Sequence, residues 1–292
     1  MEKVDWKKIA VGGGWNLGDF EYKDNAVTGL SEEGKTKFRE NKNLVLPNLI
    51  PIEEAKSFKD LKPVEVIGSF AFSHMGLESI FIPRTVKVIR DYAFEFNDLT
   101  NINLQEGIES IKDFAFSQNN ITEVTFPKSL KSIGRMILID NCVKKVVVKG
   151  RFKNFKYPLT GNEYTKILSL EDEESDEEDL AMVSKVFSNI KILDLNNLKN
   201  VKKIPTEAFT NMEIREVIFP PNIERIGFRA FRNNKIKNIV IPDSVKIIED
   251  EAFIYNPAVS LKLGNSVVKI GKDSFPRNEK MEEELFRNAL KN

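Results

Sequence analysis

The chain has 292 residues, 41% of them hydrophobic and 30% charged, a composition that lets it bury a core and remain soluble. Lys and Arg together number 44, as do Asp and Glu, so the net charge is zero; this argues against general nucleic-acid binding, which needs surplus cations, and does not support polybasic membrane attachment. The single cysteine, Cys142, excludes a disulfide within the chain, and no apolar run reaches the roughly 18 residues of a transmembrane helix.

The first segment, residues 1–44, is expected to cap one end of the fold. Its first six residues lack the apolar stretch of a signal peptide, so we expect either a cytosolic protein or a mature exported chain. Residues 20–22 and 26–30 predict a hairpin around Asp24-Asn25. Ser31 is suited to cap the N-terminus of a helix that extends to about Arg39.

A period of 22 residues dominates residues 45–275. Apolar anchor residues recur at this spacing in two series, Ile67, Ile89, Ile111 and Ile133, then Ile204, Ile226, Ile248 and Ile270. Five residues after most anchors stands a phenylalanine, usually preceded by alanine, as in Ala93-Phe94. The period is too short for helical-hairpin repeats, which need about 33 to 47 residues.

Each repeat predicts one coil of a solenoid. Apolar residues such as Leu99, Ile102 and Leu104 stand 10, 13 and 15 positions after an anchor, and their alternation predicts a short half-buried strand. Proline often follows and ends the strand. A second extended piece and one helical turn around Ala-Phe complete the coil. Because a single coil cannot bury its apolar face, stacked coils are expected to share a parallel sheet and a core.

Two degenerate repeats occupy the middle of the chain. Phe155 and Met182 each lie one period from an anchor, and the 27 residues from one to the other exceed a period by five. The surplus coincides with an acidic run over residues 171–179, so we place an insertion near 171–181 and expect a solvated loop. Calcium binding by this run stays open, although it lacks the ligand spacing of an EF-hand. About ten coils are expected in all.

Residues 276–292 predict a capping helix at the other end. A solenoid exposes strand edges at both ends, and these must be covered. The segment from Met281 is amphipathic and can cover such an edge. Its expected apolar face consists of Leu285, Phe286, Ala289 and Leu290.

The repeat resembles the BspA-like class of leucine-rich repeats. Ile226-Gly227 and Ala230-Phe231, followed by Ile239-Val240-Ile241-Pro242, match the class pattern, and the resemblance extends over roughly residues 45–275. It implies an α/β solenoid, a right-handed superhelix with a parallel sheet on one face and short helical turns opposite. It further implies a bacterial cell-surface or secreted protein used in adhesion, although the chain departs from such proteins in lacking a sortase signal and a cell-wall-binding module.

Few residues are suited to catalysis. The one histidine, His74, and Cys142 fall three coils apart, roughly 15 Å at about 4.8 Å per coil, whereas a nucleophile and its base must lie within about 3 Å. We expect His74 to be an exposed turn residue and Cys142 a small, partly buried one. One His and one Cys exclude the usual zinc sites within one chain. We therefore expect no enzyme, no cofactor and no metal.

Asparagine recurs eight residues after the anchor. A row of polar ligands is one interpretation. The favoured one is structural, because stacked asparagines can bond the backbone of successive turns. The row contains Asn97, Asn119, Asn141, Asn234 and Asn256.

The outward face of the predicted sheet is the candidate binding surface. Residues 14 positions after the anchor should point away from the core. Several are apolar, which strand propensity also explains, but an apolar row among polar neighbours is typical of a contact surface. The candidate binding residues are Phe81, Asn103, Thr125, Val147, Ile218 and Val240.

The leading hypothesis for the function is a non-catalytic adhesion or recognition module that binds a protein partner, such as a host or matrix protein, through the sheet face. The alternative is an intracellular scaffold, or the repeat portion of a larger multidomain enzyme. A hydrolase with paired carboxylates from adjacent coils is a third interpretation, for which no pair is singled out. We expect no nucleic-acid partner and no membrane insertion.

Overall fold

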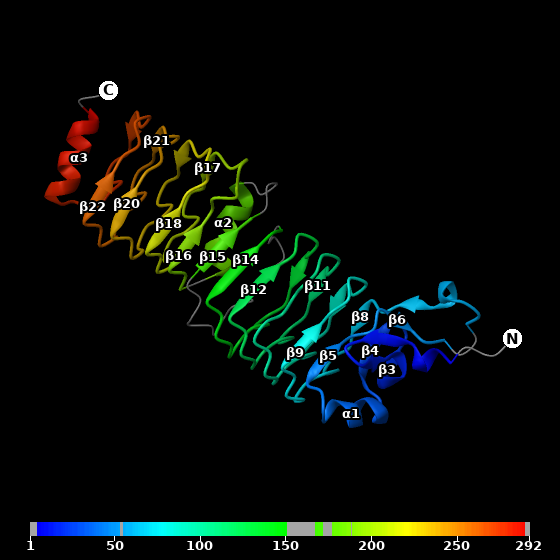
Figure 1. Cartoon of the computed structure of the whole chain (residues 1–292). Coiled ribbons are helices and arrows are strands. Elements are labelled where there is room, and N and C mark those ends of the chain that lie inside the picture. Colours follow the sequence, from blue (N-terminus) through cyan, green and yellow to red (C-terminus); the bar gives the residue numbers. More distant parts are fainter. Residues whose placement is uncertain (1–4, 53–54, 151–166, 172–176, 188, 290–292) are drawn as a thin grey trace. The chain divides into compact units, whose positions relative to one another are not determined.

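A computed structural model describes residues 5–52, 55–150, 167–171, 177–187 and 189–289 (Figure 1). The chain divides into two compact units. Unit 1 consists of Met1–Val143 with Asn154–Asn162, and unit 2 consists of Lys144–Lys153 with Glu163–Asn292. Each unit is a β-solenoid of stacked coils, as the period predicts.

The N-terminal part of unit 1 is a small antiparallel assembly joined to the first coil. β3 (Phe20–Lys23) and β4 (Ala26–Leu30) form a hairpin with Asp24 and Asn25 at its turn. The hydroxyl of Ser31 accepts a hydrogen bond from the amide of Gly34 and so caps α1 (Glu32–Phe38). The preceding elements are η1 (Trp6–Lys8), β1 (Ala10–Gly12), β2 (Trp15–Asn16) and η2 (Leu17–Asp19).

Two sets of parallel strands build the coils of unit 1. The anchor strands pair in register, and β4 extends their ladder at one edge. They are β8 (Val66–Ile67), β10 (Val88–Ile89), β11 (Ser110–Ile111) and β13 (Ser132–Ile133). The second set comprises β5 (Asn43–Val45) paired with β9 (Ser79–Phe81), and β12 (Glu123–Phe126) bridged to Asn101. Between them lie β6 (Leu49–Ile50), η3 (Phe58–Asp60) and β7 (Lys62–Pro63).

Unit 2 repeats this plan. Its anchor ladder contains β17 (Lys203–Ile204), β19 (Arg225–Ile226), β21 (Ile247–Ile248) and β23 (Lys269–Ile270). The other strands are β14 (Lys145–Val148), β15 (Ile167–Leu170), β16 (Ile192–Asp194) and β18 (Glu216–Ile218), then β20 (Asn238–Val240) and β22 (Ser260–Lys262). The helices are α2 (Glu177–Val186) and α3 (Glu279–Ala289).

Eight anchor strands are present among the described residues, against the ten coils expected. Phe155 lies outside the described residues, and Met182 lies in α2, so this coil has a helix where the others have a short strand. The strand register also shows that the five surplus residues are not inserted at one place. Asp194 pairs with both Ser169 and Ile218, at separations of 25 and 24 residues, so the surplus falls on both sides of β16.

The expectation of a solvated acidic loop over 171–181 is wrong at its C-terminal part. Residues 177–181 belong to α2, and Leu180 is buried. Leu180, Val183 and Phe187 recur at the three- and four-residue spacing that places side chains on one helical face, and all three are buried. Calcium binding by residues 172–176 lies outside the described residues.

The segments around Ala-Phe are successive turns, not the helical turns that we expected. Phe70 and His74 have positive φ values of 56° and 57°. Their amides, with that of Phe72, donate to the carbonyl oxygens of the next coil, at Asp91, Ala93 and Glu95, over 2.9 to 3.1 Å. A helix would direct these amides along its own axis. The left-handed residues direct these amides toward the neighbouring coil, so backbone hydrogen bonds join adjacent coils along this edge as well.

Stacked phenylalanines fill the core of each unit. Phe72, Phe94 and Phe116 are fully buried, with ring centroids 5.6 and 5.2 Å apart in succession. Phe209, Phe231 and Phe253 repeat the arrangement in unit 2. Burying each such side chain is worth about 1.5–3 kcal/mol, and each ring pair adds about 0.5–1.5 kcal/mol. The constant period is therefore required by the core, because it keeps like side chains in register.

The C-terminal helix α3 contacts β22, but its buried face differs from our expectation. Met281 is fully buried and Leu285 half-buried, whereas Phe286 and Ala289 are exposed. Leu290 lies outside the described residues. Asn278 sets this orientation, because its side-chain oxygen accepts a hydrogen bond from the amide of Met281 while its amide group donates to the carbonyl of Ala258.

Candidate functional site

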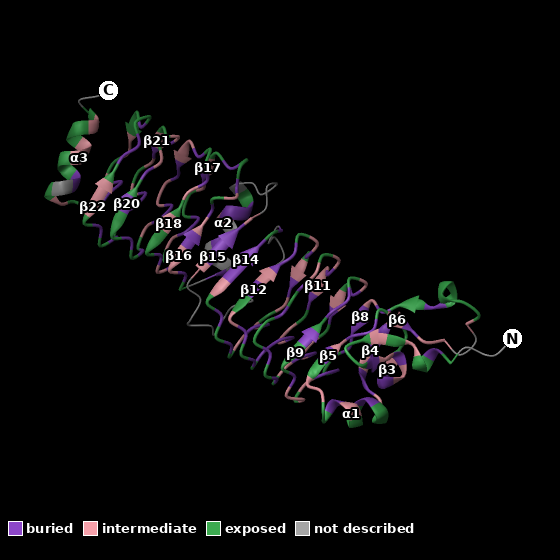
Figure 2. Cartoon of the chain, viewed as in Figure 1, coloured by how far each residue is buried: buried purple, intermediate pink, exposed green. Residues whose placement is uncertain are grey.

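The outward sheet face carries most of the expected binding residues at exposed positions. In unit 1, Phe81 is 47% exposed, Asn103 is exposed and Thr125 is half-buried. In unit 2, Ile218 is 39% and Val240 57% exposed, on strands whose neighbouring positions turn inward. Figure 2 shows these alternating classes along β9, β18 and β20. Exposed apolar side chains thus occupy this face in each unit.

Val147 does not belong to this surface. It is only 8% exposed, and its partner in register, Ser169, is 3% exposed. Both faces of β14 and β15 are therefore withdrawn from solvent, where the alternation predicts one wet face. Continuous apolar runs such as Val146-Val147-Val148 are typical of strands buried on both sides.

The asparagine row lies inside the coils and bonds the backbone of two coils at once. The side-chain oxygen of Asn97 accepts hydrogen bonds from the amides of Met75 and Leu77, one coil earlier, at 3.2 and 2.9 Å. Its amide group donates to the carbonyl oxygens of Phe72 and Phe94 at 2.8 and 3.0 Å. The same contacts to neighbouring turns recur at Asn119, Asn141, Asn234 and Asn256. These five side chains are buried, so their contacts are internal.

A stack of aromatic rings on the turn edge of unit 1 was not among the expected features. Phe70, Tyr92 and Phe114 lie parallel with centroids 4.8 and 5.0 Å apart, and His74 stacks on Phe96 at 4.8 Å. Phe70 and Phe96 are more than half exposed. The available signal was an aromatic residue three positions after the anchor in three consecutive repeats. Charged residues hold these positions in unit 2, where Arg229 pairs with Glu251 at 2.8 Å.

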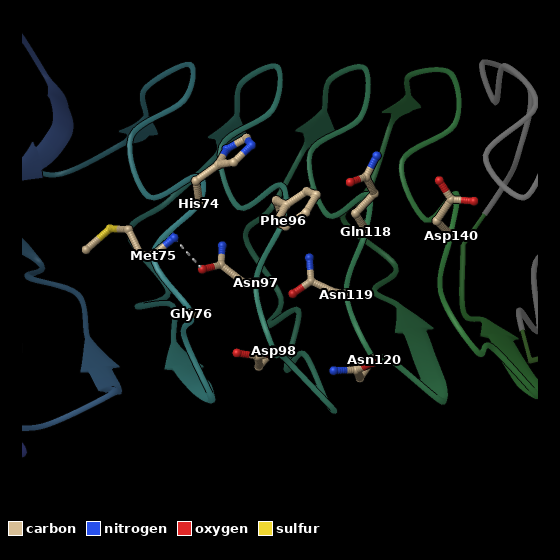
Figure 3. A pocket seen from close by; sticks show the side chains of 10 residues that line it. All are labelled: His74, Met75, Gly76, Phe96, Asn97, Asp98, Gln118, Asn119, Asn120 and Asp140. Carbon is tan, nitrogen blue, oxygen red and sulfur yellow. Dashed lines mark hydrogen bonds between the residues drawn. The ribbon is translucent and has the colours of Figure 1, made fainter.

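Beside these rings lies a hollow of about 820 Å³ formed by four successive turns of unit 1 (Figure 3). The exposed side chains Asp98, Asn120 and Asp140 line it, and in Figure 3 the carboxamides of Asn97 and Asn119 lie in a row between Phe96 and Gln118 on one side and Asp98 and Asn120 on the other. These groups can donate and accept hydrogen bonds, but the asparagine oxygens are already engaged by backbone amides. The hollow holds no pairing of a nucleophile with a base.

His74 and Cys142 are the two residues whose types are most often found in catalytic and metal sites, and we expected neither role for them. His74 is an exposed turn residue, whereas Cys142 is exposed and not partly buried as we expected. Its neighbour Asn141 takes the inward position, so the next residue along the turn points outward. Within the described ranges, no three His, Cys, Asp or Glu side chains gather as metal ligands would. Among the same residues, no helix has the length and apolar character needed to cross a bilayer.

Rows of alternating charge run along the coils just before the anchors. Glu65, Lys87, Glu109 and Lys131 stand one period apart, and the Lys131 ammonium lies 2.8 Å from the Glu109 carboxylate. The hydrogen bond from Lys87 holds the pKa of Glu65 below its ordinary value, and that from Lys131 does the same to the pKa of Glu109. Because positive and negative side chains alternate, each row carries little net charge, in keeping with the zero net charge of the whole chain.

Several solved structures are similar to this chain. A leucine-rich repeat protein from Bacteroides ovatus is 16% identical, with 88% of this chain and 89% of that one covered and a TM-score of 0.27. One from Eubacterium ventriosum is 14% identical, with 82% and 65% covered and a TM-score of 0.42. A leucine rich cell surface protein from Faecalibacterium prausnitzii is 17% identical, with 88% and 71% covered and a TM-score of 0.34.

Sequence comparison identifies the family. The search of curated proteins found no match. The family model of the BspA type leucine rich repeat region matches residues 52–159 and 181–292, in six copies. The matched residues are more than half of the chain and include coils of each unit. The chain therefore belongs to the BspA-type leucine-rich repeat family.

Proposed function

We propose that this protein is a non-catalytic recognition module that binds a protein partner through the outward face of its sheet. One observation carries the proposal: large apolar side chains stand exposed at outward positions of the sheet in each unit, Phe81 in unit 1 and Ile218 and Val240 in unit 2, while Ile80 and Ile239 beside them are buried. Exposed apolar groups on a rigid sheet are the anchors from which protein interfaces are built. Membership of a repeat family supports an interaction role.

We further propose that the module acts in adhesion at a bacterial cell surface or after secretion. The resemblance of the repeats to those of BspA-like surface proteins supports this location. The partner class that we infer is a host or matrix protein, because the face offers apolar anchors with polar neighbours such as Asn103 and Asn238 and no surplus of one charge.

A binding screen of the purified chain against extracellular-matrix and cell-surface proteins tests this function. The Phe81→Glu/Ile218→Glu variant places two charges on the face, and we expect it to weaken binding at least about tenfold. The matched control is Val268→Glu/Phe286→Glu, two exposed apolar residues outside the face. Circular dichroism checks that all variants fold.

Each outcome of the screen decides something. Binding that is lost in the face variant and retained in the control supports recognition through the sheet face. Equal binding by both variants contradicts that site. A chain that binds none of the surface and matrix proteins contradicts the adhesion role.

A further inference from the structure

The sheet of unit 2 is interrupted between β18 and β20. β18 pairs with β16, and β20 pairs with β22, but no ladder joins β18 to β20 in the part of the chain that the structure describes. The coils are still bonded just before these strands, where the amide of Lys235 donates to the carbonyl of Ile214 at 2.7 Å. The anchor strands behind them are paired without a break. The interruption is therefore confined to one face.

A crevice of about 350 Å³ opens at this interruption. Val217, Phe219 and Val240 supply the apolar part of its lining, with the core residues Ile239 and Phe253, and the polar part comes from side chains such as Asn238. This volume lies near the lower limit of about 300 Å³ for small-ligand pockets, so it accommodates one or two side chains rather than a whole domain. We name it the β18–β20 crevice.

Val217 and Phe219 occupy core positions and yet are only half-buried. Their counterparts one coil later, Ile239 and Ile241, are each 2% exposed. Unit 1 provides a comparison, because β9 and residues 101–103 also lack a ladder between them in the described structure. There the core residues stay buried, with Ile80 at 8% and Ile102 at 4%. An interruption alone does not expose the core, so the crevice is particular to this site.

The two strand edges at the crevice present backbone groups suited to a peptide. The carbonyl of Ile218 accepts from the amide of Leu195, on the β16 side. The amide of Ile241 donates to the carbonyl of Lys262, on the β22 side. Because successive residues of a strand direct their backbone groups to opposite edges, those of Val217 and Val240 face the crevice. Such edges are templates for the backbone of an added extended segment.

The rim of the crevice carries more positive than negative charge. Arg215 and Lys237 stand at equivalent positions in adjacent coils and are both exposed. Neither side chain has an ion-pair partner among the described residues, and Glu216 is the one carboxylate among the lining residues. Two cations beside an apolar crevice complement a ligand whose apolar group lies next to carboxylates.

We propose that the β18–β20 crevice binds an extended peptide segment of a protein partner, in which one bulky apolar side chain is flanked by Asp or Glu. The apolar side chain enters the crevice, the peptide backbone pairs with the open strand edges, and the flanking carboxylates meet Arg215 and Lys237. This inference rests on the proposed protein-binding function and names the peptide chemistry that the site recognises. A lipid chain would leave the backbone edges unpaired, so they favour a peptide.

An immobilised set of blocked pentapeptides tests the proposal on the whole chain. The central residue is Phe, Leu, Ile or Trp, and the flanking residues are Asp, Lys or Ser. We expect saturable binding of the Asp-flanked members, at least about tenfold tighter than of the Lys-flanked ones. Arg215→Glu/Lys237→Glu should remove this preference. The control Lys112→Glu/Lys269→Glu makes the same change in charge at two exposed lysines outside the crevice and should retain the preference.

A second variant tests the apolar part of the crevice. Val217→Phe fills it and should weaken binding of every apolar-centred peptide, with the fold checked by circular dichroism. The proposal is overturned if no peptide binds saturably. It is also overturned if the Arg215→Glu/Lys237→Glu variant and the Lys112→Glu/Lys269→Glu control bind the Asp-flanked peptides equally. The peptide assay uses no macromolecular partner. Peptide binding without any partner in the screen would overturn the adhesion role alone, and a partner bound without peptide binding would overturn the crevice alone.

Discussion

At the scale of single residues, asparagine provides hydrogen-bond partners for the buried backbone groups of the turns. Each turn leaves amide and carbonyl groups in a buried environment, and an unpaired buried group costs about 1–3 kcal/mol. An asparagine has one accepting oxygen and two donating hydrogens, so it can serve both its own turn and the preceding coil. Asn119 does so with Leu99 on one side and Phe116 on the other. Recurrence of Asn in the sequence follows from this requirement.

Asn119→Ala tests this role. The change removes the acceptor of the Leu99 amide and the donor to the carbonyls of Phe94 and Phe116, so we expect a loss of about 2–4 kcal/mol in the free energy of unfolding. Urea unfolding followed by circular dichroism measures it. Asn120→Ala is the matched control, since that side chain is exposed and should change stability by less than about 0.5 kcal/mol. Equal effects of the two variants would show that the buried contacts do not matter.

At the scale of elements, rows of like position decide how neighbouring coils interact. The turn edge of unit 1 stacks Phe70, Tyr92 and Phe114, whereas the same positions of unit 2 pair Arg229 with Glu251. The aromatic residues of unit 1 and the charged residues of unit 2 adopt the same left-handed backbone conformation, with φ near 54° to 58°. A bulky residue in this region is uncommon, and stacking of each ring on its neighbours offsets part of the strain. The edge can therefore change its chemistry without changing the fold.

The charge rows predict how stability depends on pH. The folded pKa values of Glu65 and Glu109 lie below the ordinary 4.5, first because of hydrogen bonds from Lys87 and Lys131. A lowered folded pKa adds stability above the unfolded pKa of about 4.5 and loses it as the pH falls through the folded value. We expect Glu65→Gln/Glu109→Gln to destabilise the protein at pH 7 and to have no such effect at about pH 3.

Urea midpoints at both pH values measure this effect, and added salt should reduce it because the pairs are exposed. The control is Glu78→Gln/Glu123→Gln, two exposed carboxylates without an ion-pair partner among the described residues. A destabilisation by the first variant that is the same at both pH values would contradict the electrostatic explanation.

At the scale of the whole molecule, stability should be distributed over the coils. In a solenoid each repeat contacts only its neighbours, so the free energy of unfolding approximates a sum over coils and their interfaces. The buried Phe stacks and asparagine contacts recur in both units with nearly the same geometry. A local defect should accordingly be felt in its own coil and in the two beside it.

A double variant tests this view. Asn119→Ala and Asn234→Ala change coils that are not neighbours, and we expect their effects on unfolding to add within about 0.5 kcal/mol. Asn97→Ala combined with Asn119→Ala changes adjacent coils, where both side chains bond the carbonyl of Phe94, and should depart from additivity. Strong coupling in the distant pair would contradict a stability that is the sum of local terms.

The sequence by itself determined the solenoid, its period, the anchor strands, the asparagine row and the expected outward face, because stacked coils force equivalent residues into register and each repeat restates the same pattern. Only the tertiary structure decided which positions of that face meet solvent. Val147 and Ser169 are buried although the alternation points them outward, and Val217 and Phe219 are half-exposed although it points them inward. Periodicity reports the face on which a side chain lies, whereas burial depends on what the neighbouring coils place against that face. The β18–β20 crevice lies where a ladder stops between two strands of ordinary sequence and the core side chains beside it are left half-exposed, and both features are properties of the packed molecule rather than of one repeat.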